Sequence, residues 1–519
     1  ISNEVRAIIE TSKGNIYFAS KLGLLKVNLA NYEIEIQNLF FQNTANNATT
    51  MEQPWLLNIF EDKNRGIWFG SYGNGLFYKK PHADLISYKL QNIPLAERWA
   101  LSFIELTIGK IFLNNEQGSL FYKESGSELF TKIETGINVF WMHKDPNDNL
   151  ILLSDNNELF RFSTTTMKTS QIESWLGNNG SIGEPTHFIR NSLCYINNTR
   201  KLECFDTETL QYIEHMPDGE QQVQTLGSRD DSSLWAVTDN NSIYSFSLDT
   251  ATFEFAYSIE EFGLTKFRTK NLISTRKHLW VSSTSQGLLA IDRETHKATL
   301  FNESNQLLNN YISDLIIDSN DNLWFSTNKN INFVDSDMLL VKRFDDDYQL
   351  TGTEFNDFSS ILTTNNEIYF GTPTGYISFF PEKLAISSQH LQTPQITNIS
   401  IANRSLSQLN YAKFDTEKKN ERSYKFTRKV EIAYKQFPLR IDFASANTAL
   451  PNQTKYKYRL LGLEDDWIIT NIDNRHATYT NLSPGKYVFE VAVFDTVNPK
   501  ESNKSTLNVT ILPPWWLST

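Results

Sequence analysis

The chain has 519 residues, which is too many for one compact core. Of these residues 40% are apolar and 21% are charged, a composition that excludes a disordered protein. Its net charge is −12 and it has no stripe of Lys and Arg, which argues against binding of nucleic acid. No stretch approaches the roughly 20 apolar residues that span a bilayer, and no leader opens the chain, so Ile1 suggests a processed or trimmed product.

A repeated pattern fills the first three quarters of the chain. The segments "GNIYFASKLGLLKVN" (14–28) and "RGIWFGSYGNGLFYKK" (65–80) read alike, and seven more copies follow. The equivalent apolar positions are Ile16, Ile67, Ile111, Leu150, Leu193, Leu234, Leu279, Leu323 and Ile368. Each copy alternates short apolar runs with Asp, Asn and Gly turns, as four antiparallel strands do.

Four short strands repeated at about 45 residues are typical of a β-propeller blade. We therefore predict an all-β chain whose residues 1–385 form a propeller. Nine repeats are visible, so nine blades is the literal count, while a ring of seven or eight and two partial rings remain alternatives. The aromatic residues inside the repeat are expected to pack between blades; they are Trp68, Trp235, Trp280 and Trp324.

The two cysteines lie in "SLCYINNTRKLECFD". If this segment folds as a hairpin centred near Thr199, Cys194 and Cys204 face each other across two strands. That spacing allows a disulfide, and the alternative is a pair of half-buried reduced thiols.

The residue that precedes the innermost strand of a repeat can be located by counting back twelve residues from the apolar anchor, with the count adjusted for local loop differences in some repeats, as for His187 and Arg268. Such residues lie at one end of a propeller, where ligands often bind. The candidates, with one adjacent arginine, are Glu4, Trp55, Arg98, Trp99, Asn138, His187, Gln222, Arg268, Tyr311 and Asn356. Aromatic rings mixed with polar groups suit a polar, ring-shaped ligand such as a sugar, and the alternative is that these side chains only fill the channel.

Catalytic motifs are not found: the sequence has no G-x-S-x-G, P-loop, H-E-x-x-H or C-x-x-C. The eight histidines are scattered without metal-ligand spacing, so we expect no catalytic residue, no metal and no cofactor. Acidic runs such as "FDDDY" (344–348) could bind Ca²⁺, but a solvated turn explains them as well.

A second domain is predicted at 386–512. Strict alternation recurs in "LRIDFAS", "YKYRLLG", "HATYTNL", "KYVFEVAVF" and "TLNVTIL", without a repeat. About seven strands in 120 residues are typical of an immunoglobulin-like β-sandwich. The last residues, 513–519, are "PPWWLST".

Both parts resemble known families. "GIWFGSYGNGLFYKK" looks like the two-component regulator propeller repeat, and "FGTPTGYISFFP" looks like the last repeat of such arrays. "YKYRLLGLEDDW" and the residues after it resemble the triple-tyrosine (Y_Y_Y) domain, with Tyr458, Tyr479 and Tyr487 at matching places.

The resemblance implies the periplasmic sensor region of a membrane receptor. In such proteins the sandwich is followed by one transmembrane helix and a cytoplasmic output, a histidine kinase or a diguanylate cyclase. It also implies a small-molecule ligand, with oligosaccharide as the first guess, and a homodimer formed through the sandwich.

Trp515 and Trp516 would then lie at the membrane–water interface before a missing helix, where amphipathic rings prefer to sit. The alternative is that both rings pack back on the sandwich. Two other functions remain open: a periplasmic scaffold that binds a protein on the propeller, and a propeller glycosidase or lyase.

Overall fold

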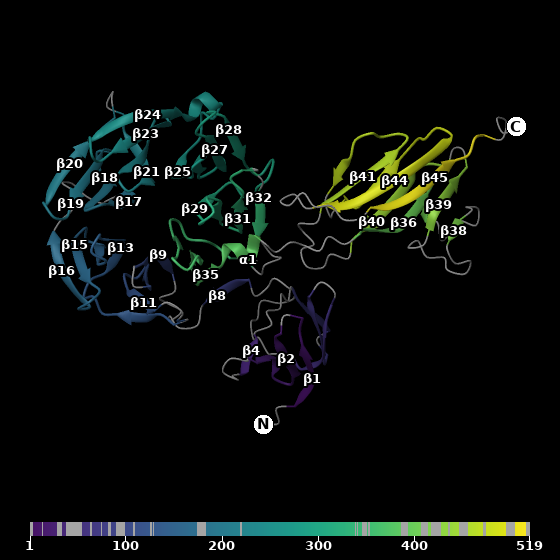
Figure 1. Ribbon diagram of the computed structural model, residues 1–519, viewed down its shortest axis with the longest axis horizontal. Coiled ribbons are helices and arrows are strands. Elements are labelled where there is room, and N and C mark those ends of the chain that lie inside the picture. The colour runs from purple at the N-terminus through teal and green to yellow at the C-terminus, as the bar shows by residue number, and fades with distance from the viewer. Residues whose placement is uncertain are drawn as a thin grey trace. The chain divides into compact units, whose positions relative to one another are not determined.

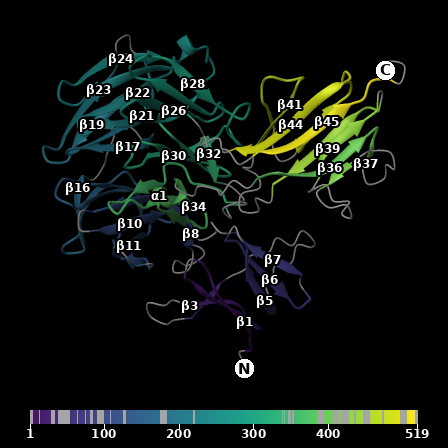
Figure 2. The same cartoon turned by 45° about the vertical axis from the view of Figure 1, so that its right-hand side comes forward.

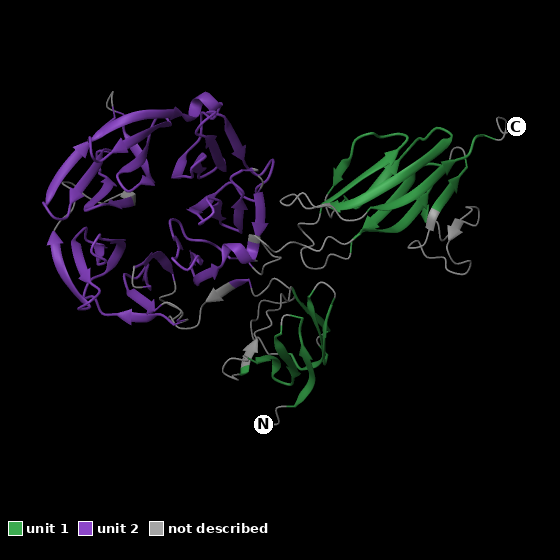
Figure 3. Cartoon of the chain, in the orientation of Figure 1, with its two compact units in different colours: residues 1–84, 387–519 green, residues 85–386 purple. Residues whose placement is uncertain are grey.

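The computed structural model divides the chain into two compact units, which are described separately: residues 85–386 form one, and residues 1–84 and 387–519 the other (Figure 3). The structure describes residues 4–12, 14–27, 34–37, 54–62, 65–73, 75–80, 85–89, 99–106, 109–124, 127, 129–173, 183–217, 221–337, 339, 341–344, 350, 353–385, 393–405, 414–416, 427–433, 436–445, 455–470, 474–494 and 504–514.

Residues 85–386 form a ring of seven four-stranded blades (Figure 1). Along the chain, blades 1 to 3 are β9 (Ala100–Glu105), β10 (Lys110–Asn115), β11 (Leu120–Glu124) and β12 (Thr131–Ile133); β13 (Val139–Lys144), β14 (Leu150–Ser154), β15 (Leu159–Ser163) and β16 (Lys168–Glu173); and β17 (Gly183–Ile189), β18 (Ser192–Ile196), β19 (Leu202–Asp206) and β20 (Gln211–His215). Blades 4 and 5 are β21 (Val223–Asp230), β22 (Ser233–Thr238), β23 (Ser242–Ser247) and β24 (Thr252–Ser258); and β25 (Thr269–Ser274), β26 (His278–Ser283), β27 (Leu288–Asp292) and β28 (Ala298–Phe301). Blade 6 is β29 (Ile312–Ile317), β30 (Leu323–Thr327), β31 (Ile331–Val334) and β32 (Val341–Phe344), and blade 7 is β33 (Ser360–Leu362), β34 (Ile368–Thr372), β35 (Gly375–Phe379) and β8 (Ile86–Lys89).

The ring closes through β8, the first strand of the unit, which pairs with β35, the last. The innermost strands follow one another around the ring, and β33 of blade 7 contacts β9 of blade 1. At this closing seam, Asn356 Nδ2 and Ser359 Oγ both donate to the Ala100 carbonyl oxygen, at 2.7 and 3.0 Å. A Cβ atom on Gly371 would come within 2.0 Å of Ser359 Oγ, so the seam requires glycine there.

The nine sequence repeats therefore do not form one ring of nine blades. Counted by sequence, β8 is the fourth strand of the second repeat, but in the structure it completes blade 7 instead. The first two repeats belong to the other unit, as β1 (Val5–Glu10), β2 (Ile16–Ser20), β3 (Gly23–Val27) and β4 (Ile34–Gln37), and as the three-stranded sheet β5 (Leu56–Glu61), β6 (Ile67–Ser71) and β7 (Leu76–Lys79).

Large apolar side chains fill the space between blades, as their period-2 alternation predicts. Trp280 is fully buried among residues of blades 5 and 6, and the ring of Trp324 on blade 6 lies 4.9 Å from that of Phe379 on blade 7. Trp235 packs in the core between blades 4 and 5. The prediction that these three tryptophans pack between blades is confirmed, whereas Trp68, in the other unit, packs on Tyr78 of its own sheet.

The turn between the first two strands of a blade is held by one polar side chain. Asp318 Oδ1 accepts hydrogen bonds from the backbone N–H groups of Asn320 and Asn322, while its Oδ2 accepts from Trp324 Nε1 at 2.9 Å. Asp145 closes the equivalent turn of blade 2. These carboxylates stabilise the turns of the fold through hydrogen bonds.

The C-terminal part is a sandwich of two sheets (Figure 2). One sheet consists of β36 (Gln395–Ile401), β37 (Arg404–Ser405), β40 (Leu439–Ala444) and β43 (His476–Tyr479). The other consists of β38 (Phe414–Thr416), β39 (Thr427–Ile432), β41 (Lys455–Leu461), β42 (Ile468–Thr470), β44 (Gly485–Phe494) and β45 (Ser505–Ile511). The three tyrosines of the sequence motif lie in or against its core, and Tyr487 OH donates to the Ser483 carbonyl at 3.0 Å. The predicted fold class, an all-β propeller followed by an immunoglobulin-like sandwich, is confirmed.

Candidate functional site at the strand-start end of the ring

We call the end of the ring at which the innermost strands begin the strand-start end, and the opposite end the turn end. Five predicted residues directly precede an innermost strand of the ring: Trp99, Asn138, Gln222, Arg268 and Tyr311. In four of them the backbone carbonyl accepts a hydrogen bond from the residue that follows the second strand, at 3.0 to 3.2 Å. These four residues therefore occupy equivalent positions in the repeat, because each is set by the same hairpin register.

Glu4 and Trp55 occupy the same place in β1–β4 and β5–β7, which lie outside the ring. The ring of Trp55 lies 5.1 Å from that of Tyr72, and Lys21 Nζ lies 4.8 Å from its centroid. The predicted set is therefore divided between the two units.

Two predicted residues occupy other places. His187 lies inside β17, opposite Cys194, because this strand is longer and has a bulge between Gly183 and His187. Asn356 is buried, and its amide is used by the closing seam. Arg98 lies outside the described residues.

A charged network links three blades at the strand-start end. Lys270 Nζ on β25 donates to Tyr311 OH at 2.8 Å and lies 2.5 Å from Asp357 Oδ1. Tyr311 OH in turn donates to Asp357 Oδ2 at 2.7 Å. Lys270 is 9% exposed, whereas the Asp357 side chain is 40% exposed, so the network runs from the interior of the ring to solvent.

A second carboxylate lies beneath this network. Asp314, on β29, is buried and accepts hydrogen bonds from Asn271 Nδ2 and from the Leu315 N–H. Burial raises its pKa to about 6, against the opposing effect of its hydrogen bonds and of the Lys270 cation. Burial likewise raises the pKa of Tyr311, so the phenol keeps its proton at neutral pH.

This arrangement can hold a polar ligand. Asp357 offers acceptors, and Trp99, 40% exposed on blade 1, offers an aromatic face. Tyr311, whose hydroxyl proton is donated to Asp357, offers a remaining acceptor lone pair. Lys270, Asp314 and Asp357 are not among the residues predicted from the sequence. A lysine between the apolar alternation of "FRTKNLIS" was the one available signal, since a buried lysine needs a partner.

The opposite end of the innermost strands carries two histidines. His143 Nε2, on β13, lies 2.9 Å from Thr186 Oγ1, and His187 is on the neighbouring strand β17. Burial lowers the pKa of His143 to about 3 and that of His187 to about 4, so both imidazoles are neutral. Among the residues that the structure describes, no group of His, Cys, Asp or Glu is arranged to hold a metal ion.

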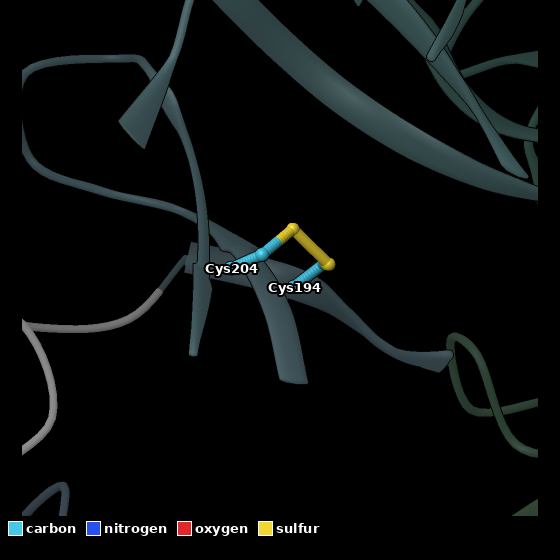
Figure 4. Close-up of a disulfide and its surroundings, with 2 residues drawn as sticks. All are labelled: Cys194 and Cys204. Carbon is cyan, nitrogen blue, oxygen red and sulfur yellow. A yellow bond between two sulfur atoms is a disulfide. The ribbon is translucent and has the colours of Figure 1, made fainter. Parts of the chain in front are cut away.

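Cys194 and Cys204 form a disulfide (Figure 4). The two residues pair directly across β18 and β19, and both are buried against residues of blade 4. The hairpin predicted from the sequence is thus present.

The C-terminal tryptophans Trp515 and Trp516 lie outside the described residues. No helix in the described part of the chain is long and apolar enough to cross a membrane.

Two domain families match the chain. Residues 447–512 match the Y_Y_Y domain, and residues 306–329 match the two component regulator propeller. The second match covers the blade 5 to blade 6 connection and the first hairpin of blade 6, including Tyr311 and Asp314.

Individual proteins are also similar to this chain. Histidine kinase P4 from Formosa agariphila is 28% identical over 209 residues, which is 40% of this chain and 15% of that protein. The extracellular domain of the hybrid two component system BT3049 from B. thetaiotaomicron has the same fold, with a TM-score of 0.65, 19% identity and coverage of 98% of this chain and 73% of that one. The extracellular domain of BT4673 from the same organism aligns at a TM-score of 0.45 and 18% identity, over 99% of this chain and 70% of that one. The resemblance seen in the sequence is confirmed: one stretch of the chain matches the two component regulator propeller and another the Y_Y_Y domain, and the similar proteins include a histidine kinase and the extracellular domain of a hybrid two component system.

Proposed function

We propose that this chain is the periplasmic, ligand-sensing ectodomain of a membrane-anchored receptor, and that the ligand binds at the strand-start end of the ring. The output, a histidine kinase or a diguanylate cyclase, would lie outside this chain. The chain itself is a sensor and catalyses no reaction.

The observation that carries this proposal is the network of Lys270, Tyr311 and Asp357. A buried cation joined to an exposed carboxylate across three blades is costly to build for stability alone, because ions lose hydration on burial. Polar groups that are already oriented on rigid strands suit recognition, since little conformational entropy is then lost when a ligand binds.

Blade 7 would connect this site to the exit from the ring. Asp357 precedes β33 of blade 7, and α1 (Pro381–Ala385) follows β35 of the same blade. Lys342 Nζ on blade 6 donates to the Leu384 carbonyl at 3.0 Å and holds the end of α1. A ligand that binds one arrangement of blade 7 better than another would shift the receptor by that difference in affinity. We propose that a homodimer formed through the sandwich receives this shift.

The experiment is a thermal-shift screen of this chain against oligosaccharides and other small metabolites, with oligosaccharide as the first ligand class. A ligand at a hundredfold excess over its Kd stabilises the native state by about 2.7 kcal/mol. We expect a selective rise in Tm that is lost in Trp99→Ala and Tyr311→Phe but kept in Leu129→Ala, an exposed control on blade 1.

Two results would count against the proposal. A panel without any shift would argue against small-molecule sensing by this chain. A shift that survives both test substitutions would place the ligand elsewhere.

A further inference from the structure

An exposed apolar patch lies on the outer rim of the ring. Ile213 on β20 is 49% exposed and Phe255 on β24 is 58% exposed. Among the outermost strands of the ring whose side chains are described, the large apolar residues at least 40% exposed are Ile213 and Tyr212 on β20 and Phe255 on β24. We call Ile213 and Phe255 the β20–β24 patch.

The two side chains face the same seam, between blades 3 and 4. Ile213 pairs with Cys204 and so lies on its face of the sheet, which packs against blade 4. His215, two residues on, confirms this direction, because its ring lies 4.8 Å from that of Phe246 on blade 4. Phe255 lies two residues after Phe253, whose ring packs 4.9 Å from the same Phe246.

Two other seams receive an apolar side chain from the chain's own connecting segments, and the short helix α1 buries a third apolar side chain. Ile259, in the helical turn η2 (Ile259–Phe262), is fully buried in the core between blades 4 and 5. Leu307 packs between blades 5 and 6, and Leu384 of α1 is fully buried, with its carbonyl bound by Lys342 of blade 6. A seam of this ring thus accommodates an inserted apolar residue.

The charge of the ring indicates what kind of segment would be attracted to it. Residues 85–386 contain 23 Lys and Arg against 40 Asp and Glu, a net charge of −17. A partner with complementary positive charge associates faster and is distinguished from acidic competitors.

We propose that the β20–β24 patch binds a partner protein through a segment with large apolar side chains flanked by Lys or Arg. The apolar side chains cover Ile213 and Phe255 and remove them from water. The basic flanks are attracted by the net negative charge of residues 85–386. This surface is independent of the ligand site proposed above.

The test is an array of twelve-residue peptides whose four central positions are drawn from Ile, Leu, Val, Phe, Trp and Tyr. One half of the array is flanked by Lys and Arg and the other by Asp and Glu. We expect the fluorescently labelled chain to bind basic-flanked peptides selectively. Kd, measured by fluorescence polarisation on the best of them, should rise at least tenfold in Ile213→Glu and in Phe255→Glu.

A matched control is Leu129→Glu, which adds the same charge at an equally exposed apolar residue on blade 1 and should leave Kd unchanged. An unchanged Tm in all three variants shows that the ring is intact. The proposal is overturned if no peptide binds, if acidic-flanked peptides bind equally well, or if the patch variants bind like the control. It is also overturned if light scattering shows a dimer of this chain that Ile213→Glu dissociates, because a second copy would then be the occupant.

Discussion

The two ends of the ring are built from the same strands but differ in what their polar groups do. At the turn end, Asp145 and Asp318 accept hydrogen bonds from their own turns, and the pattern repeats between blades. At the strand-start end the backbone repeats, but the side chains change from Trp99 to Asn138, Gln222 and Arg268. The polar side chains that repeat from blade to blade therefore stabilise the ring at the turn end. The side chains that vary on an unchanged backbone, at the strand-start end, are available for recognition.

The largest effect is expected from Asp318→Ala at the turn end. It removes four hydrogen bonds and leaves the buried Trp324 Nε1 without an acceptor, which should lower the free energy of unfolding by about 4 kcal/mol. Asp155→Ala, at the strand-start end, removes an exposed bond to Asn138 and should cost less than about 0.5 kcal/mol. Calorimetric unfolding of both variants would contradict the comparison if the two losses were equal.

Acid should destabilise the ring through the turn-end histidines. Because their pKa values in the folded state are lowered to about 3 and about 4, the unfolded chain binds protons first as pH falls below 6.5. Their stabilising contribution is complete above pH 6.5 and is lost between pH 6.5 and 4, by about 3 kcal/mol for each histidine.

Asp314 at the other end acts in the opposite direction. Because its pKa is raised to about 6, the ionised carboxylate destabilises the fold above pH 6. This penalty disappears as pH falls toward 4, which offsets about 3 kcal/mol of the stability lost through the histidines. Unfolding of the wild type and of His143→Gln/His187→Gln between pH 7 and 4 should differ most at pH 4. Parallel pH profiles would show that the histidines are not neutral in the folded ring.

Removing the disulfide should have an intermediate effect. Cys194 and Cys204 are ten residues apart, and freeing a loop of that length from its cross-link lowers stability by about 2.7 kcal/mol. Urea unfolding of Cys194→Ala/Cys204→Ala, compared with the oxidised wild type, measures this. An unchanged midpoint would mean that packing alone holds the β18–β19 hairpin.

The smallest effect on stability is expected from Gln222→Ala. This side chain is exposed at the strand-start end, so the free energy of unfolding should change by less than about 0.5 kcal/mol. If the residue contributes to recognition, the thermal shift produced by a ligand falls while the Tm of the free protein stays the same. A large loss of stability would instead give this end of the ring a structural role.

Much of this architecture could be predicted from sequence because it depends on local register. Counting back twelve residues from the anchor gave the correct place for Trp99, Asn138, Gln222 and Tyr311, and the count adjusted for loop length gave it for Arg268, since hairpins of nearly constant length separate the two positions. The predicted place was wrong where the number of residues between strand start and anchor changes, which is the case for His187 at the bulge of β17 and for Asn356 before β33.

Contacts between distant segments could not be predicted in this way. The contact between Lys270 and Asp357 joins residues of blades 5 and 7, and it depends on how seven blades close. The pairing of β8 with β35 was missed for the same reason, because nothing in "LISYKL" distinguishes a fourth strand of its own repeat from one that closes the ring.

That pairing has a consequence for the order in which the ring forms. Open repeat arrays can nucleate anywhere and grow in both directions, since each unit contacts only its neighbours. Here residues 86–89 have no partner strand until residues 375–379 have been synthesised, about 290 residues later. Joining such distant segments carries a loop-closure entropy that grows with the logarithm of the intervening length, although blades folded in between shorten the effective loop. During synthesis from the N-terminus, six blades can therefore form in succession. The seventh forms in a single late step, which closes the open array into a ring whose blades then unfold cooperatively.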